Sequence, residues 1–232
     1  MCGWIGNVTD SPLTRALLEI LGMDDLLPRL RNNPGSGPAS SVDIIVGGEE
    51  GPQVKEALWW LLLERQEGRL RPSRYTSFNT RSDKLDQKRS VGYRPYRDSR
   101  CLVPASYFIE GTGPKGRRIY HRIEPTDAAF ALGGLYRTWV DRESGEISHS
   151  CSVITLSPHP SDVWQAIHPK STPLMLPPEP QLIDRWLDPE FDRVEAFRPL
   201  LEPRFRQSVR CVPVERPGDQ RQVGDVIEIA AG

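Results

Sequence analysis

The sequence begins MCGWIG, which places a cysteine directly after the initiator methionine. Removal of Met1 would leave Cys2 as the N-terminal residue, with an amine and a thiol on the same residue. Their reference pKa values are about 7.7 to 8.0 and about 8.5, so both nucleophiles are partly available near neutral pH. Such a residue can act as the nucleophile of a hydrolase, or it can condense with an aldehyde to an imine and then to a thiazolidine ring. The alternative is that Cys2 is a small apolar residue buried under a sheet.

Two titratable side chains lie in apolar surroundings where acid/base chemistry is favoured. Glu110 ends the run CLVPASYFIE, and desolvation at such a position raises the pKa of a carboxyl group toward neutrality. The alternative for Glu110 is a residue that caps a turn at the end of a strand. His168 lies in WQAIHPKSTPLML and is a candidate general acid or base, or else a core histidine with satisfied hydrogen bonds.

The stretch SFNTRSD offers two further candidates. The amide of Asn79 could hold a reacting group, and the guanidinium of Arg81 could bind a phosphate. A turn-forming asparagine followed by a surface arginine is the alternative.

Positive charge is concentrated in one segment, residues 65–100. This segment carries eleven Lys or Arg, Arg74 among them, against four Asp or Glu, a net charge of +7, whereas the rest of the chain carries −8. Aromatic residues interleave with the charges, as in a groove that follows phosphates while rings stack on unpaired bases. They are Tyr75, Phe78, Tyr93 and Tyr96. The alternative is a solvated face with a few core aromatics.

The composition argues against several classes of protein. A net charge of −1 is unlike that of a protein that coats nucleic acid indiscriminately. The sequence has no apolar run near 18 residues and no basic and apolar N-terminal region, so we expect neither a membrane span nor secretion, and a cytoplasmic or nuclear location. Its four cysteines are far apart and form no CxxC pair, so we expect neither a zinc site nor a disulfide. We also expect no cofactor. Cys101, Cys151 and Cys211 lie in apolar stretches and are predicted to be buried.

The elements that must position these residues are strands in the middle of the chain and helices toward its ends. We expect one or two helices over 9–30, opened by a cap at Thr9 or Asp10 and stopped by NNPGSGP, and a short helix over 178–189. Residues 56–63 read as a buried apolar segment. Strands are expected over 41–48, 100–111, 128–140 and 150–157. This order predicts an α+β fold without alternating βαβ units.

The order of the motifs resembles the SOS-response-associated peptidase (SRAP) family, whose members sense abasic sites and crosslink to single-stranded DNA. The matching stretches run from the N-terminus to residue 189: MCG at 1–3, FNTRSD at 78–83, RCLVPASYFIEG at 100–111, ALGGLYRTW at 131–139, SVITLSPHPSDVWQAIHPKSTPLML at 152–176 and RWLDP at 185–189. The resemblance implies a single domain over residues 1–232, with a central, mostly antiparallel, barrel-like β core flanked by helices.

The resemblance also implies a reaction and the residues that perform it. Cys2, freed by self-removal of Met1, matches the nucleophile that forms a thiazolidine with the aldehyde of an abasic site. Asn79 matches the amide that holds the N-terminal residue and the opened sugar, Glu110 the acid/base carboxylate, and His168 the proton donor to the sugar oxygen. The expected partner is single-stranded DNA that contains abasic sites, bound by a monomer.

The residues expected to contact DNA are Arg81, Trp4, Trp59, Arg74 and Lys170. Some of these positions depart from the family pattern. Trp4 stands where the family has an arginine, and Trp59 is the only match to a WGL-type loop.

Other departures concern the surroundings of the acid/base residues. Gly111 replaces the family's aromatic residue after the glutamate, and Pro169-Lys170 replaces an Asp-Arg pair, which leaves His168 without its usual orienting partner. Two other functions therefore stay open: a thiol peptidase that acts on other proteins, and a divergent module that binds single-stranded DNA without a covalent bond.

Overall fold

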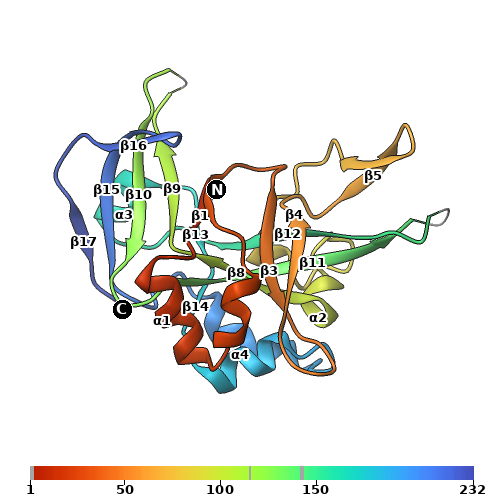
Figure 1. Ribbon diagram of the computed structural model, residues 1–232. Coiled ribbons are helices and arrows are strands. Elements are labelled where there is room, and N and C mark those ends of the chain that lie inside the picture. Colours follow the sequence, from red (N-terminus) through yellow and green to blue (C-terminus); the bar gives the residue numbers. More distant parts are fainter. Residues whose placement is uncertain (1–2, 115, 142–143) are drawn as a thin grey trace.

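The chain folds into a closed barrel joined to a curled sheet, with helices packed against one side (Figure 1). The computed structural model describes residues 3–114, 116–141 and 144–232. The architecture is α+β, as the order of the elements predicts, and most strand pairs are antiparallel, as the family resemblance implies.

The barrel is a ring of five strands. In ring order they are β3 (Ser41–Val46), β4 (Gln53–Leu58), β12 (Ile147–Leu156), β11 (Phe130–Val140) and β8 (Arg100–Ala105), which returns to β3. The ring closes because β12 pairs with both β11 and β4, the latter through a parallel bridge between Ser150 and Leu58. Three short strands attach to it: β7 (Asn79–Arg81), β13 (Thr172–Pro173) and β14 (Met175–Leu176).

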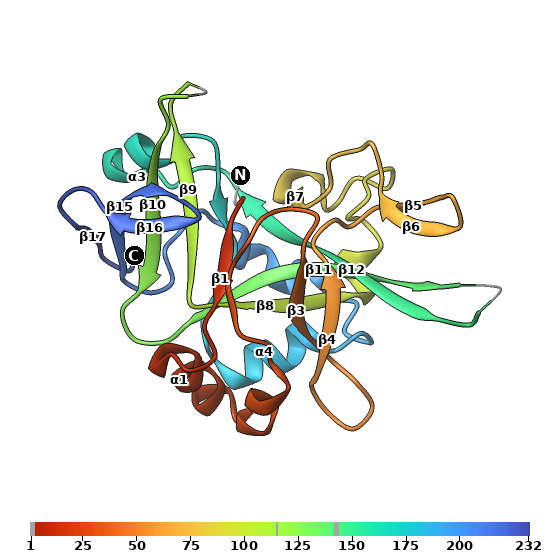
Figure 2. The same ribbon diagram turned by 45° about the horizontal axis from the view of Figure 1, so that its top comes forward.

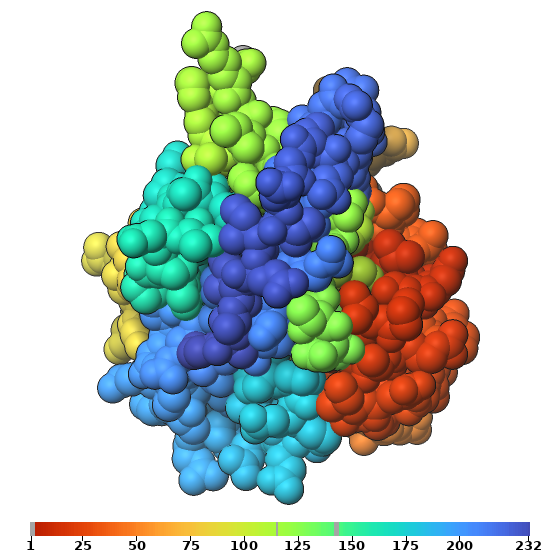
Figure 3. Space-filling model, turned by 90° about the vertical axis from the view of Figure 1, so that its left-hand side faces the viewer, coloured from red at the N-terminus to blue at the C-terminus, as the bar shows by residue number. Residues whose placement is uncertain are grey.

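The curled sheet joins strands from both ends of the chain to a hairpin from its middle. Its order is β16 (Asp219–Gln222), β15 (Val209–Arg216), β10 (Ile119–Pro125), β9 (Tyr107–Thr112), β1 (Ile5–Asn7) and β2 (Asn33–Ser36), with β17 (Ile227–Ile229) paired to β15. Figure 3 shows the C-terminal strands in blue across the outside of this part of the molecule, beside the projecting β9–β10 hairpin in green. A separate hairpin, β5 (Leu63–Gln66) and β6 (Arg69–Pro72), projects on the other side of β1 (Figures 1 and 2).

Residues 100–111, expected as one strand, form two strands that belong to different sheets. β8 ends at Ala105 in the barrel and β9 begins at Tyr107 in the curled sheet. Ser106 marks the change of direction: its amide donates to the carbonyl of Gly6 (2.8 Å), and its hydroxyl accepts from the amide of Val8 (2.8 Å). The N-terminal strand is therefore hydrogen-bonded to the chain at the point where it leaves the barrel.

Alternate residues of the barrel strands face two cores, as the period of two in a strand requires. Cys101 and Val103 of β8 and Ile44 of β3 belong to the inner cluster, whereas Leu102 and Ile45 belong to the outer cluster beneath the helices. All three cysteines in the described residues are free and buried, which confirms the expectation for them.

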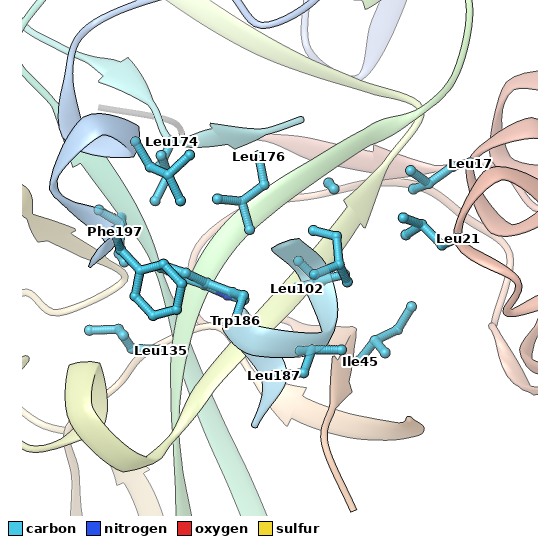
Figure 4. Packing of buried hydrophobic residues seen from close by; sticks show 14 of the residues in the cluster. Leu17, Leu21, Ile45, Leu102, Leu135, Leu174, Leu176, Trp186, Leu187 and Phe197 are labelled. Atoms are coloured by element: carbon cyan, nitrogen blue, oxygen red, sulfur yellow. The ribbon is translucent and has the colours of Figure 1, made fainter. Parts of the chain in front are cut away.

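The outer core is covered by helices (Figure 4). They are α1 (Pro12–Leu21), α4 (Pro180–Leu187) and the 3₁₀ helices η1 (Asp24–Arg29) and η3 (Val194–Leu201). The remaining helical elements are η2 (Ser82–Lys84), α2 (Pro95–Asp98) and α3 (Asp162–Ile167). Trp186 of α4 is fully buried and donates its indole N–H to the carbonyl of Cys101 (3.0 Å), so α4 is tied directly to the barrel.

The helix start predicted at Thr9 or Asp10 is wrong, because the N-cap is Ser11. Its hydroxyl accepts from the amide of Leu13 (3.3 Å), and Pro12 follows as the first helical residue. Gly22 ends the helix in the left-handed conformation (φ 65°), which glycine adopts without the penalty that other residues incur.

A buried arginine joins the barrel to the helices. Arg100 is 2% exposed, and burial lowers the pKa of its guanidinium. Its side chain donates to backbone carbonyls of Tyr96, Arg97, Trp186, Asp188 and Phe191. These bonds hold the C-terminal end of α4 and the segment around α2 against the start of β8.

No helix among the described residues is long and apolar enough to cross a membrane.

Candidate active site

A cleft of 480 Å³ lies where the curled sheet meets the loop after α3. Its walls come from five segments: the N-terminal residues Gly3 and Trp4, the β9–β10 hairpin, the loop around Phe78, residues 168–170, and Pro217 in the turn between β15 and β16. Glu110 and His168, predicted independently from their apolar surroundings, both line it. The solvent-facing cations of the lining are Arg118 and Lys170.

Glu110 is held in the wall of the cleft by β9. Its neighbours along the strand, Phe108 and Ile109, are buried on opposite faces, and Glu110 itself is 2% exposed. Burial raises the pKa of its carboxyl group from 4.5 to about 7. A carboxyl group in this range is partly protonated at neutral pH and can both donate and accept a proton.

His168 is fixed at the end of α3. The helix is capped by Ser161, whose hydroxyl accepts from the amide of Trp164 (3.3 Å), and the amide of His168 donates to the carbonyl of Trp164 (2.6 Å). The imidazole is 5% exposed and lies against the buried indole of Trp164. Burial, with the positive charge of Lys170 adding to it, lowers the pKa of His168 well below its ordinary value, so the ring is neutral at pH 7.

The two side chains are in direct contact. Nδ1 of His168 lies 3.3 Å from Oε2 of Glu110, and Nε2 lies 3.3 Å from Oγ of Ser171. Because the imidazole is neutral, this is a close polar contact between a carboxyl group and an imidazole, not an ion pair.

Ser171 supplies the orienting contact that the sequence left open. The Pro169-Lys170 replacement leaves His168 without the partner that the family pattern gives it. The hydroxyl of Ser171 contacts the imidazole instead. Ser171 is itself buried, and its carbonyl accepts from the indole N–H of Trp164 (3.1 Å). The three side chains therefore form a packed unit.

His121 is a member of the site surroundings that the sequence analysis missed. It lies directly opposite Glu110 in the pairing of β10 with β9, so the two side chains are on the same face of the sheet. It is 8% exposed, burial lowers its pKa, and within the described residues its Nδ1 is buried without a hydrogen-bond partner. The only sequence signal for it was the alternation of IYHRIEP, which places His121 on the buried face.

An aromatic ring fills the place opposite Gly111. Tyr120 is its register partner on β10, and a Cβ atom on Gly111 would lie 2.8 Å from the tyrosine ring. Both residues line the cleft. The aromatic residue that the family pattern has on β9 is thus replaced by one from β10, which the sequence analysis also missed.

Trp4 lines the cleft as a half-buried residue. Its carbonyl accepts from the amide of Ile109 (2.9 Å), and its ring packs so closely on Gly35 that a Cβ there would lie 2.2 Å from the indole nitrogen. The backbone around residue 4 is therefore paired with the strand that carries Glu110.

Asn79 and Arg81 lie on β7, which pairs in parallel with β12. Asn79 is half-buried next to Phe78, a residue of the cleft wall. The side chain of Arg81 is 72% exposed and makes two hydrogen bonds to the carboxylate of Asp83 (2.9 and 2.8 Å). An exposed pair of this kind is worth at most about 1 kcal/mol.

The expectation that Trp59 contacts DNA is wrong. Its ring is completely buried in the inner core, and its indole N–H donates to the carbonyl of Phe78 (2.8 Å). The half-buried Trp60 also packs on Phe78, with ring centroids 5.6 Å apart. The unbroken apolar run EALWWLLL gave no basis for telling the two tryptophans apart.

Arg74 is exposed in the loop after β6 and does not line the cleft.

Met1 and Cys2 lie outside the described residues, so the structure assigns no position to the predicted nucleophile. Gly3, which follows Cys2 in the chain, lines the cleft. Within the part of the chain that the structure describes, no three His, Cys, Asp or Glu side chains are grouped as metal ligands.

The barrel, the curled sheet and the buried carboxyl–imidazole pair define a class of α+β protein with a polar cleft beside its N-terminal strand. The family model of the SOS response associated peptidase (SRAP) matches residues 1–218, and the chain belongs to this family. No curated protein matches the sequence.

The solved structures that share this fold include proteins from two bacteria. A protein from Bacteroides thetaiotaomicron is 18% identical with a TM-score of 0.62, and the match covers 93% of each chain. A protein from Bordetella bronchiseptica is 14% identical with a TM-score of 0.63 over 100% of both chains. A phage-related protein from the same organism is 19% identical with a TM-score of 0.61, covering 97% of this chain and 100% of the other. At these identities the similarity concerns the fold.

Proposed function

We propose that this protein senses abasic sites in single-stranded DNA and attaches to them covalently through Cys2 after removal of Met1. The observation that carries the proposal is the buried pair Glu110–His168, in contact with each other in a cleft that is also lined by Gly3. A carboxyl group with a pKa near 7 matches a reaction that needs both an acid and a base at neutral pH.

The proposed reaction has three steps. First, the closed abasic sugar opens: the bond from C1 to the ring oxygen breaks, the ring oxygen takes a proton from His168, His168 takes one from Glu110, and the Glu110 carboxylate takes the proton of the C1 hydroxyl to give the aldehyde. Second, the amine of Cys2 adds to C1 and one of its protons passes to the C1 oxygen; Glu110 protonates the hydroxyl so formed, which leaves as water, and the carboxylate then takes the remaining proton from the nitrogen, which gives an imine. Third, the thiol adds to the same carbon and its proton passes to the nitrogen, which closes the thiazolidine ring.

The contact between Glu110 and His168 supports this division of labour. His168 is neutral, so it donates through an N–H that must be supplied with a new proton, and Glu110 is the acid nearest to it, with Oε2 3.3 Å from Nδ1. Asn79 is proposed to hold the N-terminal residue and the opened sugar through its amide. Self-removal of Met1 is proposed to use the thiol of Cys2 as its nucleophile.

DNA contacts are proposed for Arg81, Arg74 and Lys170, each of which has an exposed side chain. Arg118 adds a second cation to the cleft beside Lys170. Trp4 is proposed to offer its ring to a base at the rim, and Tyr120 replaces Trp59 as the further aromatic candidate because it lines the cleft. The protein is proposed to act as a monomer.

The test is intact mass spectrometry of the full chain after incubation with a single-stranded oligonucleotide that contains one abasic site. We expect a species with the mass of the Met1-free protein plus the oligonucleotide minus one water. A tetrahydrofuran analogue of the site, which has no aldehyde, should give no adduct, and Cys2→Ala should give none with either oligonucleotide. Absence of an adduct from protein with a free Cys2 amine would refute the proposal.

A protein that retains Met1 gives the matched control for binding. Acylation of the Cys2 nitrogen removes the amine without changing the basic segment, so crosslinking should be lost while affinity for the oligonucleotide is retained. Salt-dependent binding without an adduct in the Met1-free protein would instead select the noncovalent module. Cleavage of an unrelated peptide, lost in Cys2→Ala, would select the peptidase.

A further inference from the structure

The far end of β11 is an open edge of the barrel sheet. β8 pairs with β11 only as far as Leu135, opposite Arg100, and within the described residues no strand continues on that side. Residues 136–140 are paired with β12 alone, and in Figures 1 and 2 the ends of β11 and β12 project from the barrel as an arm. The chain that precedes β8 runs through α2 and not along β11, so the place where β8 would continue is not taken by any described strand.

The hydrogen bonds of β11 show which backbone groups face this edge. The amide of Tyr136 donates to the carbonyl of Ser99 (2.9 Å), the residue before β8, so it points to the β8 side. Backbone groups alternate between the two sides of an antiparallel strand. The N–H and C=O groups of Thr138 and Val140 therefore point to the open edge, and both residues are exposed.

This edge lacks the usual protection against pairing with another chain. Exposed edge strands commonly carry proline, lysine or a bulge. Residues 137–140 are RTWV, without proline or lysine, and their pairing with β12 has no irregularity. Val140 and Ile147, which oppose each other across the two strands, are 60% and 61% exposed. Strand-forming and apolar side chains beside an unprotected edge indicate that the edge pairs with a partner.

A cavity of 340 Å³ extends along the same edge. Residues 136–139 of β11 line one side of it, and residues of α2 together with Ser99 line the other. Successive side chains of a strand point to opposite faces, so a cavity that touches four consecutive residues lies beside the backbone of the strand. There is thus open space next to Thr138, and it shares no lining residue with the cleft of Glu110 and His168.

Two arginines make this cavity positive. Arg94 is exposed and Arg137 is half-buried, and within the described residues neither is in an ion pair. Asp98 is the single carboxylate among the lining residues. Burial lowers the pKa of Arg137; the charge of Asp98 opposes this effect, and the charge of Arg94 adds to it. A carboxylate brought by a partner is therefore favoured here.

We propose that this edge binds an extended peptide segment with acidic side chains, which adds a strand to β11. The backbone of the segment pairs with Thr138 and Val140, and every second side chain lies on the face of Arg137. In this mode of recognition backbone hydrogen bonds give affinity and alternate side chains give specificity. The edge offers donors and acceptors together, which match a peptide backbone, whereas the phosphates of a nucleic acid only accept. The inference does not rest on the crosslinking reaction.

The test is NMR of the isotopically labelled full chain during titration with the peptide acetyl-EVEVEVE-amide. In the free protein the amide protons of Thr138 and Val140 should exchange rapidly with solvent, whereas those of Arg137 and Trp139, which face β12, should be protected. Saturation with the peptide should shift the resonances of Thr138 and Val140 and protect both amides. The same peptide with N-methylated valines keeps the side chains but loses backbone donors, so it should not bind.

Thr138→Pro tests the edge directly. It removes an N–H that takes no part in the pairing of β11 with β12, and proline is tolerated at such edge positions. The variant should weaken the peptide at least about fivefold, while Thr138→Ala, which keeps the N–H, is the matched control. Arg94→Gln should weaken the peptide about two- to fivefold at low salt, and Arg89→Gln, exposed and outside the cavity, should not.

The NMR readout on the natural sequence keeps the proposal falsifiable even if Thr138→Pro does not fold. Amides of Thr138 and Val140 that neither shift nor gain protection at saturating peptide would overturn it. So would shifts at this edge with oligo-dT but not with the peptide, which would identify a nucleic-acid surface. Protection that increases with protein concentration in the absence of peptide would also overturn it, because a second copy of the chain would then occupy the edge.

Discussion

Replacing Glu110 with glutamine should change how the stability of the protein depends on pH, because the buried carboxyl group and its histidine partner bind protons in opposite senses. In the folded protein the pKa of Glu110 is raised from 4.5 to about 7, so between these values the folded state holds a proton that the unfolded state has lost. This contribution therefore declines as pH rises through the window. Burial lowers the pKa of His168 below 6.5, so below that value the unfolded state holds the extra proton and stability declines as pH falls.

In the natural protein, the contributions of Glu110 and His168 to the pH dependence of stability cancel between pH 4.5 and 6.5. When one of the two residues is replaced, the contribution of the other becomes measurable. A difference of one proton corresponds to about 1.4 kcal/mol per pH unit. Relative to the natural protein, Glu110→Gln should gain about 3 kcal/mol of unfolding free energy as pH is raised from 4.5 to 7. By contrast, the unfolding free energy of His168→Gln, relative to that of the natural protein, should fall by about 3 kcal/mol as pH is raised from 4.5 to 6.5.

Urea denaturation followed by tryptophan fluorescence measures these differences, since Trp59, Trp164 and Trp186 are fully buried. Subtracting the natural profile from each variant profile removes the contribution of all other titrating groups. Glu228→Gln, whose side chain is exposed on β17, is the matched control and should give a flat difference. Difference profiles that are flat for Glu110→Gln, or that slope in the same direction for both site variants, would refute the assignment of a raised carboxyl pKa.

Three further measurements address other parts of the molecule. Arg81→Ala should weaken binding to single-stranded DNA and reduce the slope of log K against log salt by about 0.7, whereas Asp83→Asn should tighten binding because it frees the guanidinium; equal affinities would remove Arg81 from the interface. Arg100→Met should lower the unfolding free energy by about 3 kcal/mol or more, measured in urea, because it leaves buried carbonyls without donors; a loss under 1 kcal/mol would contradict this. His121→Phe should raise the pH midpoint of the crosslinking rate while leaving the final yield unchanged, since it removes a polar neighbour of Glu110; an unshifted midpoint would show that His121 has no part in tuning the site.

The chemistry of the site was predictable to the extent that it depends on local sequence. Glu110 and His168 both stand in apolar runs, and their burial follows from that context. Their contact does not, because it requires β9 to leave the barrel at Ser106 and α3 to pack against it. In the run CLVPASYFIE a single serine marks a change of sheet, and apolar residues continue on both sides because both sheets are buried there.

The residues that the sequence analysis placed wrongly or overlooked have a common physical origin. Trp59 and Trp60 are adjacent in a run without polar residues, so only the pairing of β4 decides which ring enters the barrel. Tyr120 and His121 acquire their importance from the register of β10 against β9, which places them opposite Gly111 and Glu110. Register is a non-local property, set by the whole hydrophobic pattern of a strand pair and by its turn.

The same strand pairing explains why an acid on β9 and the N-terminal segment belong to one site. β1 pairs with β9 through Ile5 opposite Phe108, and the carbonyl of Trp4 accepts from the amide of Ile109, the residue before Glu110. The path of the chain from Trp4 to Gly3 is therefore fixed by backbone hydrogen bonds to the strand that holds the carboxyl group, and Gly3 reaches the cleft for that reason. A shift of one residue in this pairing would turn Ile5 and Asn7, which share one face of β1, to the opposite face. Ile5 would then leave the core, so the hydrophobic core itself maintains the position of Gly3 relative to Glu110.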